Sequence, residues 1–189
     1  YTPRTLFPYT TLFRSIYDNM SKNVEIYKKA LILYSTMTGR TKKIATIIKE
    51  DFENQNIHSE IMDVNKIPKE EIMKAINEAD VIFFGSSTKY ADIIGNMEEI
   101  LKGLSDLNLE NKIGAAFGSY GWSGEAIEVV QDYLRETNIK VLSTAGVIKS
   151  TGMIDIEFPI RIKFSPSLNN IKSIESAVIY TADLLLSAI

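Results

Sequence analysis

From residue 29 onward, short apolar runs alternate with stretches in which apolar residues recur every three or four positions. The runs have the length of buried strands, and the stretches have the single apolar face of a surface helix. Strands are predicted over residues 30–34, 59–64, 81–85, 113–117 and 141–147, and helices over residues 44–52, 69–79, 97–104, 126–134 and 174–186. This alternation predicts an α/β fold with right-handed crossovers. We expect a three-layer sandwich, with a five-stranded parallel sheet in the order 2-1-3-4-5 and helices on both faces.

One segment departs from this alternation. Between residues 153 and 164, apolar residues take every second position, which is typical of a strand with one exposed face. Pro159 cannot donate a hydrogen bond to a neighbouring strand, so a central position in the sheet is excluded. We expect an edge strand, two short strands, or an arm that extends the fifth strand. A docking surface or a dimer edge is the alternative interpretation.

The first residues do not follow the pattern. Residues 5–15 resemble a translated sequencing adapter, and we expect residues 1–15 to be an artefactual, disordered leader. They lack the apolar core and the small-residue cleavage site of a signal peptide. Residues 16–28 are polar and mixed, as in a linker remnant, and residues 29–189 are predicted to form one domain. On this interpretation the natural protein continues further upstream.

Composition narrows the possible partners. The formal net charge is −3, and an acidic chain without a basic cluster argues against nucleic acid. The chain has no cysteine and one histidine, His58, which excludes disulfides, thiolate chemistry and a multi-histidine metal site in this segment. No run of 18 apolar residues occurs, so no membrane partner is expected. We expect a cytoplasmic protein that docks with redox partner proteins.

A hydroxyl-rich loop joins the first strand to the first helix. It reads Ser35-Thr36-Met37-Thr38-Gly39-Arg40-Thr41. The helix that follows offers unpaired N–H groups and the positive end of its dipole, and the small residues allow close approach to an oxyanion. The loop therefore predicts a phosphate monoester site, with a plain helix cap as the alternative. It matches neither Gly-x4-Gly-Lys-Ser/Thr nor Gly-x-Gly-x-x-Gly.

Two further loops of similar composition follow the third and fourth strands. We expect all three loops to form one site, because the carboxyl ends of parallel strands meet at one edge of the sheet. The aromatics Tyr90, Tyr120 and Trp122 favour a flat ring as ligand, although a single loop tyrosine is more often a lid on the core. The candidate binding residues are Ser35, Thr36, Met37, Thr38, Gly39, Arg40, Thr41, Ser86, Ser87, Thr88, Lys89, Tyr90, Ser119, Tyr120, Gly121, Trp122, Ser123 and Gly124.

The third loop carries the most specific family resemblance. Residues 118–126, Gly-Ser-Tyr-Gly-Trp-Ser-Gly-Glu-Ala, resemble a segment of the flavodoxin domain of flavodiiron proteins, also called A-type flavoproteins. Residues 85–88 are similar to the Gly-Ser-Pro-Thr segment of that family. Residues 36–41 resemble its phosphate loop, and also that of flavodoxins in general. The resemblance covers roughly residues 28–150.

This resemblance implies a flavodoxin-like FMN-binding domain that transfers electrons. Flavodiiron proteins carry a diiron domain before the flavodoxin domain and reduce oxygen or nitric oxide. The chain would then be the flavodoxin module of a truncated flavodiiron protein, which lacks its upstream diiron partner and whose parent forms a homodimer. FMN would carry the chemistry, so no catalytic residue and no metal ligand are expected.

Two departures from the family pattern affect the expected contacts. Lys89, Tyr90 and Ala91 stand where the family often has asparagines, which bears on ring contacts from the second loop. Arg40 replaces the usual asparagine of the phosphate loop, and it either pairs with the phosphate or points to solvent.

Other functions share this fold. An FMN-dependent NAD(P)H:quinone-type reductase is the first alternative, and whether the chain is itself an enzyme stays open. A non-flavin interaction module of the same fold is the second. A phospho-receiver requires acidic residues where this chain has Ser35, Thr36, Ser86 and Ser87, and it is therefore disfavoured.

Overall fold

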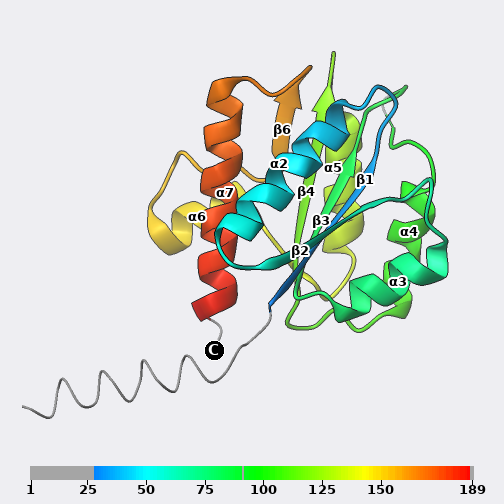
Figure 1. The fold of residues 1–189 in the computed structure, drawn as a ribbon, viewed down its shortest axis with the longest axis horizontal. Helices are drawn as coiled ribbons and strands as arrows, with labels where there is room; N and C mark the ends of the chain where they lie inside the picture. Colours follow the sequence, from blue (N-terminus) through cyan, green and yellow to red (C-terminus); the bar gives the residue numbers. More distant parts are fainter. Residues whose placement is uncertain (1–27, 91, 188–189) are drawn as a thin grey trace, which may run out of the picture.

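The computed structural model of the protein describes residues 28–90 and 92–187 and shows three layers (Figure 1). A parallel sheet forms the middle layer, with its strands in the order β2-β1-β3-β4-β5 and with β6 also paired to β4. The predicted fold class and strand order are confirmed. The predicted leader, residues 1–15, lies outside the described residues, as does the predicted linker apart from Lys28. The division into leader, linker and domain therefore stays a prediction.

The elements alternate along the chain as the apolar pattern indicates. The strands are β1 (Lys29–Ser35), β2 (His58–Asp63), β3 (Val81–Ser86), β4 (Ile113–Tyr120), β5 (Lys140–Val141) and β6 (Ile160–Lys163). The helices are α2 (Arg40–Asn54), α3 (Lys69–Glu78), α4 (Met97–Gly103), α5 (Glu125–Arg135), α6 (Thr144–Thr151) and α7 (Leu168–Ser187), with a 3₁₀ turn at Leu104–Asp106. Helices α2 and α7 cover one face of the sheet, and α3, α4 and α5 cover the other (Figure 1).

Each central strand contributes side chains to both cores, which explains why it is apolar throughout. In β1, Ile32 faces the core under α2 and α7, whereas Leu31 and Leu33 face the core under α3, α4 and α5. On the α2 side, the rings of Phe52 and Phe83 meet edge to face with centroids 5.5 Å apart. Burial of side chains of this size stabilises the fold by about 2–3 kcal/mol each. The two cores hold the sheet rigid and fix where its strands end.

The fifth strand position is divided between two short strands. The predicted strand over residues 141–147 is wrong beyond Val141, because α6 begins at Thr144 after Ser143 caps it by accepting a hydrogen bond from Gly146 N (3.2 Å). The chain then returns as β6, which pairs with β4 in parallel next to β5. Residues 160–163 alternate between buried and exposed, as predicted for a strand with one exposed face, but residues 153–164 contain this one short strand and not two.

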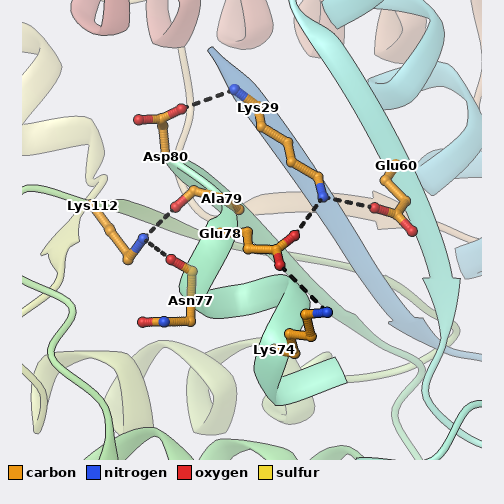
Figure 2. Close-up of polar contacts among 8 residues, drawn as sticks. All are labelled: Lys29, Glu60, Lys74, Asn77, Glu78, Ala79, Asp80 and Lys112. Carbon is orange, nitrogen blue, oxygen red and sulfur yellow. Dashed lines mark hydrogen bonds and ion pairs between the residues drawn. The ribbon is translucent and has the colours of Figure 1, made fainter. Parts of the chain in front are cut away.

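Ion pairs and hydrogen bonds close the amino-terminal end of the sheet (Figure 2). Lys29 N donates to Asp80 Oδ2 over 2.9 Å, which ties β1 to the start of β3. The Lys29 ammonium lies 3.1 Å from Glu60 and 3.5 Å from Glu78. Partial burial alone would lower the pKa of Lys29, but the hydrogen bonds and charges of Glu60 and Glu78 outweigh it and raise this pKa.

A second lysine satisfies backbone carbonyls at the same end. Lys112 Nζ donates to the carbonyl oxygens of Asn77 (2.8 Å) and Ala79 (2.6 Å), just before β3 (Figure 2). Burial lowers the pKa of Lys112, and the nearby charge of Asp80 opposes this shift. The polar groups of this end are thus directed at one another.

Candidate functional site

A buried group of three hydroxyls joins the three predicted loops at the carboxyl ends of β1, β3 and β4. Thr41 Oγ1 lies 2.8 Å from Ser87 Oγ and 2.9 Å from Ser119 Oγ. All three side chains are buried, with at most 8% of each residue exposed. Thr41 therefore acts as a tie between the loops, and its hydroxyl is already engaged. The grouping of the loops follows from the sheet, as predicted, but this internal role does not follow from the sequence.

The loop between β1 and α2 leaves the start of the helix open. Gly39 precedes α2 with φ +78°, a left-handed conformation that glycine adopts without strain. Thr36 Oγ1 accepts a hydrogen bond from Gly39 N over 3.0 Å, which folds the loop back on itself. No side chain caps α2, so the N–H groups of its first turn remain available to an anion.

A small cavity of about 130 Å³ lies at this helix start. We call it the small cavity, and it is lined by Met37, Thr38, Arg40, Ser87, Thr88, Ser119, Tyr120 and Gly121. Among these described residues none is acidic, and Arg40 is the one cation. Thr88 Oγ1 is buried, and no described residue gives it a hydrogen-bond partner. An unpaired buried hydroxyl costs free energy, which a bound oxyanion would recover.

A large cavity of about 560 Å³ adjoins the same loop. It is lined by Ser35, Met37, Asn65, Lys89, Tyr90, Asp92, Ile93, Ile94 and Gly95. Met37 lines both cavities and is 56% exposed, so it marks the boundary between them. The combined space has the size range of a cofactor site.

Asn65, which follows β2, holds the far side of the large cavity. Its Nδ2 donates to Ser35 Oγ (2.9 Å), and its Oδ1 accepts from Asn96 N (2.9 Å). A Cβ on Gly95 would lie 2.0 Å from Asn65 Oδ1, so the backbone approaches this side chain as closely as only glycine allows. Asn65 and Gly95 are not among the binding residues predicted from the sequence. Asn65 lies just beyond the end of β2, a position where binding residues are expected in this kind of sheet.

The second loop forms a small turn over the large cavity. Ser86 Oγ donates to the Ser87 carbonyl (3.0 Å) and accepts from Ile94 N (3.2 Å), which secures both ends of the loop. Lys89 and Asp92 pair through their backbones. Tyr90 lies at the tip with φ +52° and with 92% of the residue exposed.

Part of the third loop lines the small cavity, and part of it is exposed on the surface. Tyr120 and Gly121 line the small cavity with Ser119, as grouped by the prediction. Trp122 is 96% exposed, and neither Trp122 nor Ser123 lines either cavity. Gly124 immediately precedes α5 and has φ +76°, and a Cβ there would lie 3.1 Å from the Tyr120 ring. The structure thus assigns Gly124 to packing behind Tyr120.

Glu125 follows this loop as the first residue of α5. The hydroxyl of Ser123, followed by the backbone N–H of Glu125 itself, holds the pKa of the Glu125 carboxyl below its usual value. Glu125 Oε2 is buried and has no hydrogen-bond partner among the described residues. A negative charge therefore follows the third loop at the start of α5.

Comparison with known proteins identifies the family to which the chain belongs. The sequence model described as Flavodoxin matches residues 32–158. The chain belongs to the flavodoxin family. Its sheet order is the one that the alternation of strands and helices predicted.

Relatives include proteins longer than this chain. The chain is 30% identical over 122 residues to rubredoxin-oxygen oxidoreductase of Megalodesulfovibrio gigas, which covers 65% of this chain and 30% of that protein. It is 32% identical over 130 residues to the flavo-diiron protein FprA2 of Clostridium acetobutylicum, and this match covers 66% of this chain and 32% of that protein. A solved flavodoxin from the domain Archaea superposes with a TM-score of 0.67 at 29% identity, covering 84% of this chain and 99% of the other. The chain thus spans about a third of the flavodiiron relatives and is related to their flavodoxin module.

Membership of the flavodoxin family implies FMN binding, and the residues of the site fit a phosphate monoester. The small cavity combines uncapped helix N–H groups, neutral hydroxyls and one guanidinium, which are the donors that a phosphate dianion prefers. The orphaned Thr88 hydroxyl adds a donor that already lies inside the cavity. FMN would be held through its phosphate in the small cavity.

Two further cavities lie outside the three loops in the described structure, and one of them, of about 390 Å³, is lined by Glu128 and Glu157 as well as by two arginines. The other, of about 480 Å³, lies between α6 and α7, and it is mainly apolar and remote from the strand ends. No cluster of three or more His, Cys, Asp or Glu residues suitable for a metal ion occurs within residues 28–90 and 92–187. No helix in the same residues combines the length and apolar character needed to cross a bilayer.

Proposed function

We propose that this flavodoxin domain binds FMN and acts as an electron carrier. The observation that supports the proposal best is the small cavity, in which the buried, unpartnered Thr88 hydroxyl lies beside the uncapped start of α2. Bound FMN would supply the electron transfer itself. The residues of the chain hold the phosphate, orient the ring beside Met37 and exclude water from the buried side of the site.

We further propose that the natural protein is a flavodiiron oxygen or nitric oxide reductase of which this chain is the flavodoxin module. The support is the identity of 30–32% to two flavodiiron proteins about three times as long as the matched segment. In such a protein the domain passes electrons between redox partner proteins and an upstream diiron domain, in the cytoplasm and within a homodimer. The natural coding sequence upstream should encode a His-x-Glu-x-Asp-His type cluster, and an upstream frame without it would contradict this part.

An FMN titration of the full chain tests the carrier function directly. We expect 1:1 binding with the absorbance of bound flavin, no binding of comparable strength for riboflavin, and no steady-state oxidation of NADH by the loaded protein. A protein that binds no FMN would contradict the proposal, and rapid NADH oxidation would favour the reductase alternative.

The Thr88→Val variant tests the role of the small cavity. It removes the orphaned hydroxyl at nearly constant volume, so FMN affinity should fall about tenfold, as for the loss of one hydrogen bond to a charged group. Thr46→Val is the matched control, because Thr46 lies on α2 and its hydroxyl donates to the Lys42 carbonyl outside both cavities. Equal affinities of the two variants would remove Thr88 from the site.

A further inference from the structure

Phe164, the residue after β6, occupies an unexpected place and conformation. Its backbone has φ +62°, a conformation that costs a bulky residue about 1 kcal/mol or more. Its side chain is 51% exposed although it is a phenyl ring. Phe164 N donates to Tyr120 O over 2.7 Å, which continues the pairing of β6 with β4 by one residue. The conformation is thus fixed by the sheet, and it places the ring at the site.

The ring of Phe164 lies against both the first and the third loop. The guanidinium carbon of Arg40 is 5.9 Å from the ring centroid, within the range of a cation–π contact. A Cβ built on Gly121 would lie 3.5 Å from Phe164 Cε1, which places the ring beside this glycine. Arg40 and Gly121 both line the small cavity. Phe164 therefore packs on the cavity wall from outside.

The contact leaves the guanidinium charge available. Lys163 also approaches this ring, with its Nζ 5.7 Å from the same centroid. Neither Arg40 nor Lys163 forms an ion pair with a described residue. A carboxylate partner would neutralise Arg40 and occupy its N–H groups. A cation–π contact with the ring instead leaves the N–H groups of Arg40 without a carboxylate partner, so they can donate to an anion.

We propose that Phe164 is a positioning residue that holds Arg40 at the mouth of the small cavity, so that the site selects ligands that carry a phosphate over the same ligands without it. The inference rests on the proposed function of this site. A free arginine side chain loses conformational entropy when it is fixed on a ligand, and the stacked ring removes much of that cost in advance. Lys163 adds a second positive charge beside the same ring.

The test compares FMN and riboflavin binding to the full chain, freed of bound flavin, in a double-mutant cycle. Arg40→Gln should weaken FMN about tenfold and leave riboflavin unchanged, because it removes a charge-assisted contact to the phosphate. Phe164→Leu should weaken FMN about threefold when Arg40 is present and have no effect in the Arg40→Gln background. Phe164→Tyr retains an aromatic ring at this position, so its FMN affinity should equal that of the wild type.

Lys42→Gln is the matched control, because Lys42 is an exposed cation in the first turn of the same helix and lines neither cavity. Its effect on FMN affinity should be less than about twofold, as for a screened surface charge. The proposal is overturned if Phe164→Leu leaves FMN affinity unchanged, weakens riboflavin equally, or acts equally with and without Arg40.

A second readout separates this inference from the proposed function. In the flavin-free full chain, the Arg40 Nε–Hε resonance should show a ring-current offset and should shift on titration with inorganic phosphate, and both effects should diminish in Phe164→Leu. If the chain binds no FMN but shows these effects, the proposed function fails and the positioning role stands. If FMN binds but the resonance is the same in both proteins, the positioning role is overturned.

Discussion

The two ends of the parallel sheet differ in how completely their polar groups are paired with one another. At the amino-terminal end, Lys29 pairs with Glu60, Asp80 accepts from Lys29 N, and Lys112 donates to two carbonyls at the end of α3 (Figure 2). At the carboxyl-terminal end, hydroxyls surround a cavity, and the buried oxygen atoms of Thr88 and Glu125 lack partners among the described residues.

This difference separates the part of the molecule that maintains the fold from the part that binds. Paired groups contribute to stability and offer little to a ligand, whereas unpaired buried groups cost stability and are available to a ligand. Substitutions at the amino-terminal end should therefore change stability alone, and those at the carboxyl-terminal end should change affinity as well. The predictions below test that separation, from the largest expected effect to the smallest.

The first prediction concerns Thr41, which joins the loops of the carboxyl end. Thr41→Val leaves the hydroxyls of Ser87 and Ser119 buried without their partner, so the free energy of unfolding should fall by about 3 kcal/mol. FMN affinity should fall too, because the loops lose their common anchor. Urea denaturation and FMN titration measure the two effects. A loss of stability with unchanged affinity would break the proposed coupling at this end.

The second prediction concerns the opposite end of the sheet. Asp80→Ala removes the acceptor of Lys29 N and should lower the free energy of unfolding by about 2 kcal/mol. FMN affinity should remain that of the wild type, because Asp80 lines neither cavity. Asp106→Ala, which removes an exposed carboxylate outside the ion pairs of the described residues, is the control for net charge. Weakened FMN binding in Asp80→Ala would show that the two ends are not separate.

The third prediction concerns Asp51, whose Oδ2 is buried without a partner in the described structure although it lies outside both cavities. Burial, with the charges of Glu175 and Glu50, raises the pKa of Asp51 to about 6 from its usual 3.8. The folded state therefore retains a proton that the unfolded state releases, so this group's contribution to stability is greatest below pH 4 and is lost as the pH rises to about 6.

Asp51→Asn should accordingly raise the free energy of unfolding at pH 7 by about 1 kcal/mol after allowance for solvent screening, and should have little effect at pH 4. Urea denaturation at the two pH values measures this. Glu110→Gln, which removes an exposed carboxylate that is not among the charges acting on Asp51, serves as the control. If Asp51→Asn raises the free energy of unfolding equally at both pH values, the destabilisation by Asp51 does not come from its charge.

The fourth and smallest prediction concerns charge around the site. Asp92 lines the large cavity, and Glu125 carries a carboxyl whose pKa is lowered, so both are expected to oppose added negative charge on a bound flavin. The double variant Asp92→Asn with Glu125→Gln should raise the reduction potential by about 20 mV per charge removed, as for a solvent-screened Coulomb interaction. Asp106→Asn with Glu110→Gln removes two charges elsewhere, and an equal shift in that control would discard the effect.

The strands of the central sheet were predictable because a strand buried on both faces must be apolar throughout, as β1 and β3 are. The segment after Val141 was not, because a short run of mixed apolar and small polar residues such as 141–147 suits a strand or a helix, and the Ser143 cap decides between them. The pairing of β6 with β4 is likewise a contact between distant residues that periodicity does not encode.

The site was predictable as a group of loops and less so residue by residue. Loop grouping follows from parallel strands alone, whereas the role of each hydroxyl depends on distances of a few tenths of an ångström. Thr41 is for this reason a structural tie, although the motif suggests a ligand contact. Phe164 reaches Arg40 only because β6 extends β4, so its position required the structure.

The division of the fifth strand position has a consequence for association between copies of the chain. A long exposed edge strand offers a row of free backbone groups onto which another chain can add a strand, a common route to aggregation. Here that edge consists of the two residues of β5 and the four residues of β6, interrupted by α6 and carrying the charged side chains of Arg161 and Lys163. Neither piece is long enough to act as an effective template, so this edge of the sheet is protected against edge-to-edge growth.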